Sequence, residues 1–394
     1  MFEYRPVDDL EAVEELAKAA FSIRRPEHPA ITEWLEQSIA DGRTIYGVHE
    51  NGCLLAVYML YDYRMRLRSS VVPMGGIGLL CSRLDARGKG AVRFMIERSL
   101  GTMRDEGHAV SVLEPFDPSF YRKYGWELFE RRQRVETSPG SILVPDEDAA
   151  GLEGIDLLQA DEHVMAFYNE YARMNYTLVQ RDAIDWRRRT DILPWNTNAA
   201  ARGVVCMSRN GRVGGLIGYD LSRKTDDWDP TFTVNLFLYE NEAAKREMLR
   251  YLKRLSHQIK TLKLELPVDL DLWPYFPNGM GKRAVHDFFM IRIVSIEALD
   301  GLAIDTEDTA VTVEVVDEQA PWNAGRWRIE SRGGALRVTP TDQCDVKCGI
   351  GALSSVLSGF TDFATLVAAG RVEALDSYSG QDFPRVTTFL ADYF

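Results

Sequence analysis

The stretch that decides the fold is VVPMGGIGLLCSRLDARGKG, residues 71–90. Its apolar part, from Gly75 to Ser82, is typical of a buried strand. The run Arg87-Gly88-Lys89-Gly90 follows, and a helix with apolar residues at helical spacing comes next. Glycines at such a turn let the amides at the start of a helix approach an anion. The same turn also occurs where a strand and a helix simply pack tightly, so both interpretations stay open.

Strands and helices alternate on both sides of this stretch. Upstream, Asp8 or Asp9 is placed to cap a helix, and Asn51-Gly52 is typical of a type I′ hairpin. Downstream, a strand is expected over 108–113 and a helical turn over 119–124. These elements predict an α/β domain in the N-terminal part of the chain.

A second α/β segment repeats this order after a linker-like stretch at 137–154. It has a hairpin signal at Asn210-Gly211, then a strand, then an amphipathic helix. A gapless comparison of residues 84–100 with 239–255 places Ala243 and Lys245 opposite Gly88 and Gly90. We therefore expect a diverged internal repeat whose second copy has lost the glycine turn.

Beyond residue 296 the pattern changes to short strands followed by a helical end, which predicts an α+β domain. The expected helices of that end cover 350–357, 363–369 and 383–393. The fold class is thus α/β and α+β, with predicted domains at 1–140, 141–295 and 296–394.

Composition excludes several classes of function. The chain has 394 residues and a net charge of −13, which disfavours nucleic-acid binding and suits cationic partners, although acidity also simply aids solubility. Five scattered cysteines, with Cys344 and Cys348 lacking a second pair, predict neither a disulfide framework nor a metal site. No run of 18 apolar residues and no signal peptide is evident, so we expect a cytoplasmic protein without membrane contact.

A second motif, FYRKYGW at 120–126, lies about 30 residues after the glycine turn. Tyr121 and Tyr124 read alone as half-buried aromatic residues. Together with the glycine turn, however, the motif resembles the GNAT superfamily of acetyl-CoA-dependent N-acetyltransferases. Two GNAT-like halves followed by a sterol-carrier-like domain resemble one branch, the enhanced intracellular survival (Eis) family. FMIRIVSIEAL at 289–299 and an aromatic C-terminal residue add to that resemblance.

The resemblance implies acetyl-CoA as co-substrate and assigns residues to it. The backbone of Leu80 to Ser82 would pair with the pantetheine arm, and the amides from Gly88 to Arg93 would hold the pyrophosphate. Phe116 and Asp117 would lie along the arm near the thioester. The implied cofactor-binding residues are Leu80, Cys81, Ser82, Gly88, Lys89, Gly90, Ala91, Val92, Arg93, Phe116 and Asp117.

The resemblance also implies the catalytic and acceptor-binding residues. Tyr121 would be the general acid, and the C-terminal carboxylate of Phe394 the general base. Trp34 and Asp392 would contact the acceptor, a cationic amine of the aminoglycoside, polyamine or lysine type. The family's acidic contacts fall here at Ile23 and Tyr393, which points away from aminoglycosides. A homo-oligomer, hexameric in the family, is implied too.

The chemistry of these residue types agrees with direct transfer. An amine with a pKa near ~10.4 must lose its proton before attack, and a carboxylate can accept that proton through water. A tyrosine can share its proton with the departing sulfur, and no nucleophilic triad is present to form a covalent enzyme intermediate.

Two alternatives remain open at this level. One is a degenerate, non-catalytic GNAT scaffold that binds a lipid or small ligand through its C-terminal domain. The other is an aminoacyl-transferring relative, which also pairs two GNAT halves. The glycine turn retained at Arg87 to Gly90 favours the acetyltransferase over both.

Overall fold

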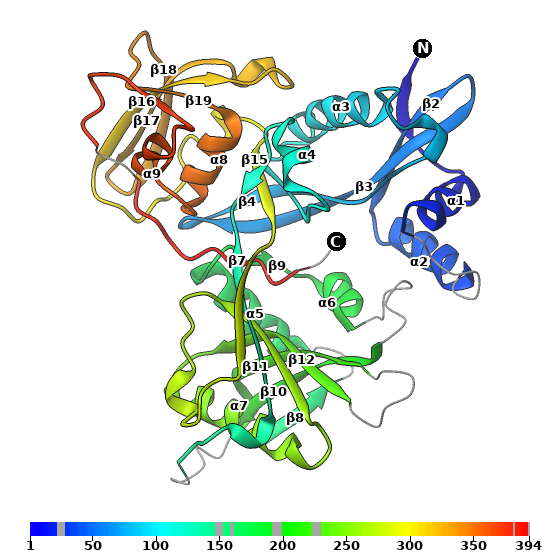
Figure 1. Cartoon of the computed structure of the whole chain (residues 1–394), viewed down its shortest axis with the longest axis vertical. Helices are drawn as coiled ribbons and strands as arrows, with labels where there is room; N and C mark the ends of the chain where they lie inside the picture. Colours follow the sequence, from blue (N-terminus) through cyan, green and yellow to red (C-terminus); the bar gives the residue numbers. More distant parts are fainter. Residues whose placement is uncertain are drawn as a thin grey trace. The chain divides into compact units, whose positions relative to one another are not determined.

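The computed structural model describes residues 1–21, 28–145, 153–157, 161–190, 199–222, 230–380 and 383–392 (Figure 1). The chain divides into two compact units. The first comprises Met1–Glu130, Tyr176–Val179 and Phe288–Phe394, and the second comprises Arg131–Asn175 and Gln180–Asp287. Among the described residues, the first unit holds two β-sheets and the second holds one.

The first sheet has the strand order β1-β2-β3-β4-β5-β15-β6, and β9 pairs with β3. β4 and β5 are parallel neighbours. The strands are β1 (Glu3–Pro6), β2 (Thr44–Glu50), β3 (Cys53–Leu67), β4 (Ser70–Ser82), β5 (Val110–Leu113), β6 (Glu127–Leu128), β9 (Val179–Gln180) and β15 (Met290–Ile293). The helices connecting them are α1 (Leu10–Phe21), α2 (His28–Ala40), α3 (Ala91–Asp105) and α4 (Pro118–Arg122).

Local sequence explains several of these elements. Asp9 Oδ1 accepts a hydrogen bond from the Ala12 amide at 3.1 Å, so the predicted acidic cap of α1 is confirmed. Asn51 and Gly52 have φ values of 52° and 78°, as a type I′ hairpin requires, and Asn210 and Gly211 repeat these values. Both predicted hairpins are therefore confirmed.

The second unit has one sheet in the order β14-β7-β13-β12-β11-β10-β8. β12 and β13 are parallel neighbours, as β4 and β5 are in the first sheet. The strands are β7 (Arg131–Thr137), β8 (Glu153–Leu157), β10 (Ala199–Arg209), β11 (Arg212–Ser222), β12 (Thr231–Tyr239), β13 (Thr261–Pro267) and β14 (Lys282–Asp287). The helices are α5 (Glu162–Met174), α6 (Ala183–Thr190) and α7 (Glu242–Arg254).

The C-terminal sheet has the order β18-β17-β16-β19-β20, and two helices follow its fourth strand. The α+β class predicted for this part of the chain is confirmed. Its elements are β16 (Thr309–Val316), β17 (Gly325–Arg332), β18 (Ala335–Pro340), β19 (Val346–Gly349), α8 (Ile350–Ser358), α9 (Phe363–Ala368) and β20 (Glu373–Ala374).

The two α/β sheets exchange strands along the chain. β7 follows the first sheet's elements in sequence but pairs with β13 and β14 in the second sheet. β15 follows the second sheet's elements but lies between β5 and β6 in the first. The domain boundaries at 1–140, 141–295 and 296–394 stay predictions.

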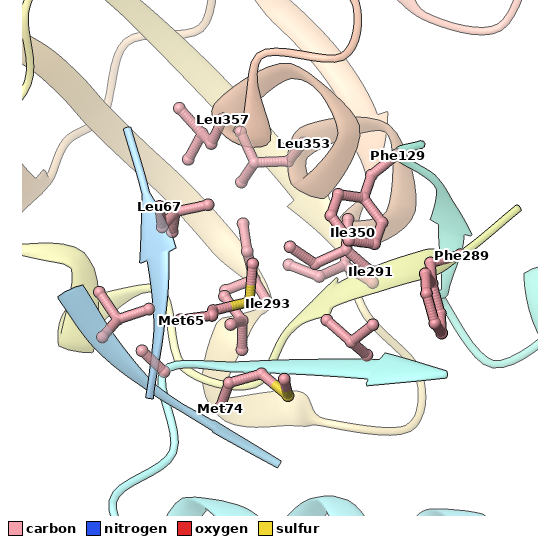
Figure 2. Packing of buried hydrophobic residues seen from close by; sticks show 14 of the residues in the cluster. Met65, Leu67, Met74, Phe129, Phe289, Ile291, Ile293, Ile350, Leu353 and Leu357 are labelled. Carbon is pink, nitrogen blue, oxygen red and sulfur yellow. The ribbon is translucent and has the colours of Figure 1, made fainter. Parts of the chain in front are cut away.

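The first sheet and the C-terminal domain share one apolar core. Figure 2 shows Ile350 of α8 beside Ile291 of β15, and both belong to one buried cluster with Ile293, Leu353 and Leu357. Every residue of α8 except Gly351 is buried. Because apolar burial is the main favourable term in folding, this shared core ties the C-terminal domain to the first sheet.

The helix expected over 383–393 is wrong for its described part. Residues 383–392 contain no helical turn, and Tyr393 lies outside the described residues. The backbone here bonds to distant segments instead: the amide of Val386 donates to Gly359 O at 2.8 Å, and that of Phe389 donates to Thr177 Oγ1 at 3.0 Å. Amides committed to such partners cannot form the ladder of a helix. We call residues 383–392 the C-terminal tail.

Candidate active site

The site begins where β4 parts from β5. The parallel pairing runs from Met74↔Val110 to Ile77↔Leu113 and then stops, while β4 continues to Ser82. On its other edge β4 stays paired with β3, but two residues, Leu79 and Leu80, stand opposite Tyr58 alone. This β-bulge puts Leu79 at a φ of 50°, which is unusual for leucine. The edge of β4 that faces β5 is therefore without a β5 partner over its last residues.

The predicted pantetheine residues alternate between the two faces of the sheet, as successive residues of a strand do. Leu80 packs against the cluster that contains Tyr121 and the buried residues of α3. Cys81 is buried in the cluster on the other face, and Ser82 is half-buried. Burial raises the pKa of the Cys81 thiol to about 12, so this sulfur stays protonated and is no nucleophile.

The predicted glycine turn joins the end of β4 to α3. A short 3-10 turn, η2 (Leu84–Ala86), comes first, and Gly90 is the N-cap of α3. Gly88 and Gly90 both have left-handed backbones, with φ of 78° and 89°. A Cβ on either would meet no heavy atom within 4 Å, so the conformation and not a lack of space requires glycine.

The amides at the start of α3 have no side-chain cap. Gly90 carries no side chain, and no cap hydrogen bond is made to this end of the helix. The first amides of any helix lack intrahelical acceptors and carry the positive end of its dipole. Arg87 and Lys89 are exposed beside them, and within the described part of the chain neither forms an ion pair. This arrangement suits a bound phosphate or pyrophosphate.

The remaining residues predicted along this helix have different roles. Ala91 is buried and Val92 packs against the same apolar cluster as Leu80, so these side chains anchor the helix. The Arg93 guanidinium pairs with Glu97 at 2.8 Å, one helical turn away. Their backbone amides, rather than these side chains, remain available to an anion.

Asp117 starts the short helix that carries Tyr121. Its Oδ1 accepts a hydrogen bond from the Ser119 amide at 2.8 Å, and Pro118 occupies the first helical position. The hydrogen bonds from Ser119 lower the pKa of Asp117. Phe116, just before it, is 71% exposed, which is unusual for a large aromatic residue and leaves a free apolar surface beside the turn.

Tyr121 is buried against an aromatic group. Its ring makes edge contacts with Phe116 and Phe120, at centroid distances of 5.4 and 5.1 Å. Burial raises the pKa of Tyr121 well above its ordinary value, so the hydroxyl stays protonated at neutral pH. Across the described residues this hydroxyl forms no hydrogen bond, and it is not among the fully enclosed polar atoms. A protonated and available donor therefore lies in the cluster that contains Leu80.

Of the residues predicted to bind the acceptor or act as the base, the structure describes Trp34 and Asp392. Trp34 packs against the core on the α1 side, in the cluster that holds Cys81 and not the one that holds Tyr121. Asp392 is buried at the end of the C-terminal tail. Phe394, Tyr393 and Ile23 lie outside the described residues.

The corresponding turn in the second unit has a side-chain cap and no glycine. β12 leads into α7 through Asn241, whose side-chain oxygen accepts from the Ala244 amide at 3.0 Å. Ala243 and Lys245, which the gapless comparison sets opposite the glycines, lie inside α7. Lys245 Nζ pairs with Glu242 at 2.6 Å. The loss of the glycine turn is confirmed: one more helical turn and a side-chain cap stand in its place.

The described residues contain neither a candidate metal site nor a helix that could span a membrane. Those residues contain no group of three His, Cys, Asp or Glu side chains that could hold a metal ion. None of their helices has both the length and the apolar character needed to cross a bilayer.

Sequence reasoning missed two features of this site. The bulge at Leu79 has no local signal, since leucine rarely adopts a positive φ. The anchoring of the C-terminal tail was hidden too: Arg68, at the β3–β4 hairpin, donates hydrogen bonds to Val356 O and Leu357 O of α8 and to Pro384 O of the tail. A single arginine in a hairpin gives no sign of partners 288 to 316 residues away.

Comparisons with known families agree with this geometry. Residues 3–129 and 177–293 each match an acetyltransferase (GNAT) domain family, and residues 296–389 match the sterol carrier protein domain. An uncharacterized N-acetyltransferase of Streptomyces avermitilis is 23% identical over 361 residues, which is 86% of each chain. Another from Streptomyces coelicolor is 26% identical over 338 residues, 79% of this chain and 78% of that one.

Solved structures share the whole fold. A GCN5-related N-acetyltransferase from Anabaena variabilis superposes with a TM-score of 0.87 at 17% identity, over 100% of both chains. Eis1 from Mycobacterium abscessus superposes with a TM-score of 0.79 at 20% identity, again over 100% of both. The chain is therefore an N-acetyltransferase of the GNAT superfamily, with two GNAT domains followed by a sterol carrier protein domain, and it has the fold of Eis.

Proposed function

We propose that this enzyme transfers the acetyl group of acetyl-CoA to the primary amine of a cationic acceptor in the first GNAT domain. The observation that carries the proposal is the open N-terminus of α3, with Gly88 and Gly90 in left-handed conformations and no side-chain cap. The amides of Gly88, Gly90, Ala91, Val92 and Arg93 would hold the pyrophosphate. The Lys89 amide donates to Ala86 O at 3.3 Å, so Lys89 would contribute the charge of its side chain, as Arg87 would.

The end of β4 would hold the pantetheine arm. Leu80, Cys81 and Ser82 lie beyond the last β4–β5 pair, so an extended chain with amide groups could add to this edge as a strand does. Phe116 and Asp117 would lie along the same arm, and the exposed Phe116 ring offers it an apolar contact.

Acetyl-CoA supplies an acetyl thioester, whose sulfur leaves as a thiolate when the amine nitrogen bonds to the carbonyl carbon. Tyr121 holds its proton at Oη and donates a hydrogen bond toward that sulfur. Thiols have pKa values near ~8.5, below that of tyrosine, so stabilisation by this hydrogen bond contributes more than complete proton transfer. The raised pKa of Tyr121 keeps the donor protonated over the working pH range.

The carboxylate of Phe394 would accept the proton that the amine nitrogen loses, through water. Support comes from the C-terminal tail, which lacks helix and strand and yet buries Phe383, Phe389 and Leu390. The tail is held by Arg68, by Gly359 O and by Phe129 O, which accepts from Thr388. This anchoring places residues 383–392 against the first sheet and the C-terminal domain.

The acceptor would be an aminoglycoside, a polyamine or a lysine-like amine. Its cationic character rests on the net charge of −13, and Trp34 and Asp392 would contact it. We further propose a cytoplasmic homo-oligomer, hexameric as in the resembling family. Release of CoA with gentamicin-type aminoglycosides, spermidine, a lysine peptide and arylalkylamines would identify the acceptor, and light scattering would give the assembly.

Tyr121→Phe tests the catalytic assignment. We expect kcat to fall about 100-fold, in the range typical of lost acid catalysis, with acetyl-CoA affinity unchanged. Tyr124→Phe is the matched control, because Tyr124 lies on the same turn and should keep its kcat. A Tyr121→Phe enzyme with full turnover would exclude the acid role.

A short extension after Phe394 tests the base. It should cripple turnover and leave acetyl-CoA binding intact, while the same extension placed before Met1 should change neither. If the C-terminally extended enzyme is fully active, the carboxylate has another function.

A further inference from the structure

A buried ion pair joins the first sheet to the C-terminal domain. Arg292 on β15 and Asp317, just after β16, have fully buried side chains. Arg292 Nη2 donates to Asp317 Oδ1 and Oδ2 at 2.7 and 2.9 Å. Removing two charges from water costs free energy, so stability alone does not account for a fully buried ion pair.

Arg292 also reaches the turn that follows Tyr121. Its Nη1 donates to Tyr124 O at 2.7 Å, and its guanidinium lies 5.4 Å from the centroid of the Trp126 ring. Between them, Gly125 has a φ of 86°, and a Cβ there would lie 1.7 Å from Arg292 Nη1. The turn is thus shaped around the arginine, and only glycine fits.

The same turn fixes the backbone of Tyr121. The amides of Tyr124 and Trp126 donate to Tyr121 O at 2.9 and 3.3 Å. A continuous path of hydrogen bonds therefore runs from Asp317 through Arg292 and the turn to the backbone of Tyr121.

A second charged contact joins the last residue of α4 to the C-terminal domain through Glu127. The carboxylate of Glu127 accepts from Arg122 Nε at 2.9 Å and from Arg371, which lies after α9 in the C-terminal domain. Arg122 follows Tyr121 directly on α4. Ser355 of α8 adds a hydrogen bond to Leu128 O at 3.0 Å.

Asp317 is itself held in place. Its Oδ1 accepts from the Ala320 amide at 3.1 Å, and its Oδ2 accepts from Asn323 Nδ2 at 3.1 Å. Asn323 in turn bonds to the backbone on both sides of Ser295, at Val294 O and the Ile296 amide. The carboxylate is therefore an organised acceptor and has little freedom to move.

We propose that Arg292 and Asp317 are positioning residues for Tyr121, so that the C-terminal domain sets the place of the acid as well as carrying the chain end. The proposal rests on the proposed function of Tyr121. Glu127 and Arg371 support the same helix at its last residue, Arg122. The C-terminal domain then contributes to turnover through Asp317 and Arg371, which touch neither substrate.

A double-mutant cycle on the full-length enzyme tests this role. Asp317→Asn keeps the shape of the side chain and removes its charge. We expect it to lower kcat about tenfold with KM for acetyl-CoA unchanged, and to have no further effect on kcat in the Tyr121→Phe background. A role in stability alone would lower activity by the same factor in both backgrounds, and that result would overturn the proposal.

A milder variant covers the case in which Asp317→Asn does not fold. Arg371→Gln removes a side chain that is 45% exposed, and we expect a kcat about threefold lower that is again masked by Tyr121→Phe. Arg326→Gln is the matched control: Arg326 is 47% exposed, pairs with Glu314 and lies away from the turn, so its kcat should match wild type. Equal losses for the two variants would overturn the proposal.

If Tyr121 is not the acid, the kinetics differ from those expected if only the positioning role is wrong. Full activity of Tyr121→Phe alone would overturn the acid role and the positioning role together. A slow Tyr121→Phe enzyme with additive losses would overturn the positioning role alone.

Discussion

The turn from β4 into α3 and the turn from β12 into α7 start from the same strand geometry. In each half, four parallel residue pairs end abruptly, at Ile77↔Leu113 and at Val234↔Leu264. In each half the long strand then carries a bulge, at Leu79–Leu80 and at Asn235. Both sheets therefore open at the same point in their topology.

The two turns differ only after the strand ends. The first has two left-handed glycines, two basic side chains and an uncapped helix. The second has Asn241 as a cap and the acidic side chains of Glu240 and Glu242, and its helix begins without a glycine. The Asn241 side chain occupies one of the amides at the start of α7, and the carboxylates of Glu240 and Glu242 repel an anion.

This difference separates what the fold requires from what cofactor binding requires. The opening between parallel strands survives in both halves, because the strand pairing itself produces it. The open glycine turn occurs in one half only, since it depends on a few residues that the sheet does not need. Loss of such a turn in a repeated domain can thus leave the architecture intact.

The largest expected effect comes from Gly88→Asp. A carboxylate close to a pyrophosphate repels it by up to about 4 kcal/mol at 4 Å before screening, so we expect acetyl-CoA affinity to fall at least about 100-fold. Calorimetry measures the loss. Gly42→Asp is the matched control, because Gly42 has a similar φ of 81° and open space around it but lies at the α2–β2 turn. Unchanged affinity in Gly88→Asp would remove this turn from the site.

A smaller effect is expected from the basic side chains of the first turn. Replacing Arg87 and Lys89 together with glutamine should weaken acetyl-CoA binding about tenfold and reduce its dependence on salt, because exposed charges act through a screened field. Lys260→Gln, an exposed lysine of the second unit, is the control and should change neither. Equal salt dependence in the double variant and wild type would show that the amides alone hold the anion.

The second turn should respond in stability and not in binding. Asn241→Ala removes the cap of α7 and should lower the free energy of unfolding by about 1 kcal/mol, as measured with urea. Acetyl-CoA affinity should stay at the wild-type value. A drop in affinity would mean that the second turn takes part in cofactor binding, so the two turns would not differ in this function.

The smallest effect is expected at the start of α9, where a carboxylate side chain caps the helix. Asp362 caps α9, and hydrogen bonding from Arg385 lowers its pKa to about 2. A lowered pKa contributes stability that is present above the unfolded value near ~3.9 and is lost as pH falls toward 2.

Asp362→Asn should therefore be less stable than wild type by under about 1 kcal/mol at pH 7, with a deficit that shrinks between pH 4 and pH 3. The Asn241→Ala deficit, which involves no titrating group, should stay constant over the same range. Thermal midpoints of both variants at each pH provide the measurement. A constant Asp362→Asn deficit would contradict the charged contact with Arg385.

Much of the fold could be predicted because its signals are local. The helix cap at Asp9, the two Asn-Gly hairpins and the glycine turn each depend on the conformational preference of one or two residues. The absence of an open turn in the second half followed in the same way from Ala243 and Lys245. The earlier start of α7 did not follow, because it needed the cap at Asn241 to be identified.

The tail shows why the rest could not be predicted. Residues 383–393 have apolar spacing that suits a helix, yet the described part contains no helical turn. Its amides find partners at Gly359, Thr177 and Glu130, and these residues come together only in the folded chain. Local preference is worth a few tenths of a kcal/mol per residue, and buried hydrogen bonds to fixed partners outweigh it.

By itself, the sequence determined where strands and helices alternate and which half keeps a glycine-bearing turn, because backbone preferences at those residues act over a few neighbours. Only the tertiary structure decided that β4 has a bulge at Leu79, that Arg292 and Asp317 pair next to the turn after Tyr121, and that Arg68 holds the tail. Each of these depends on burying a polar or strained group among partners far apart in the chain. The free energy of such a contact exists only once the surrounding core has formed.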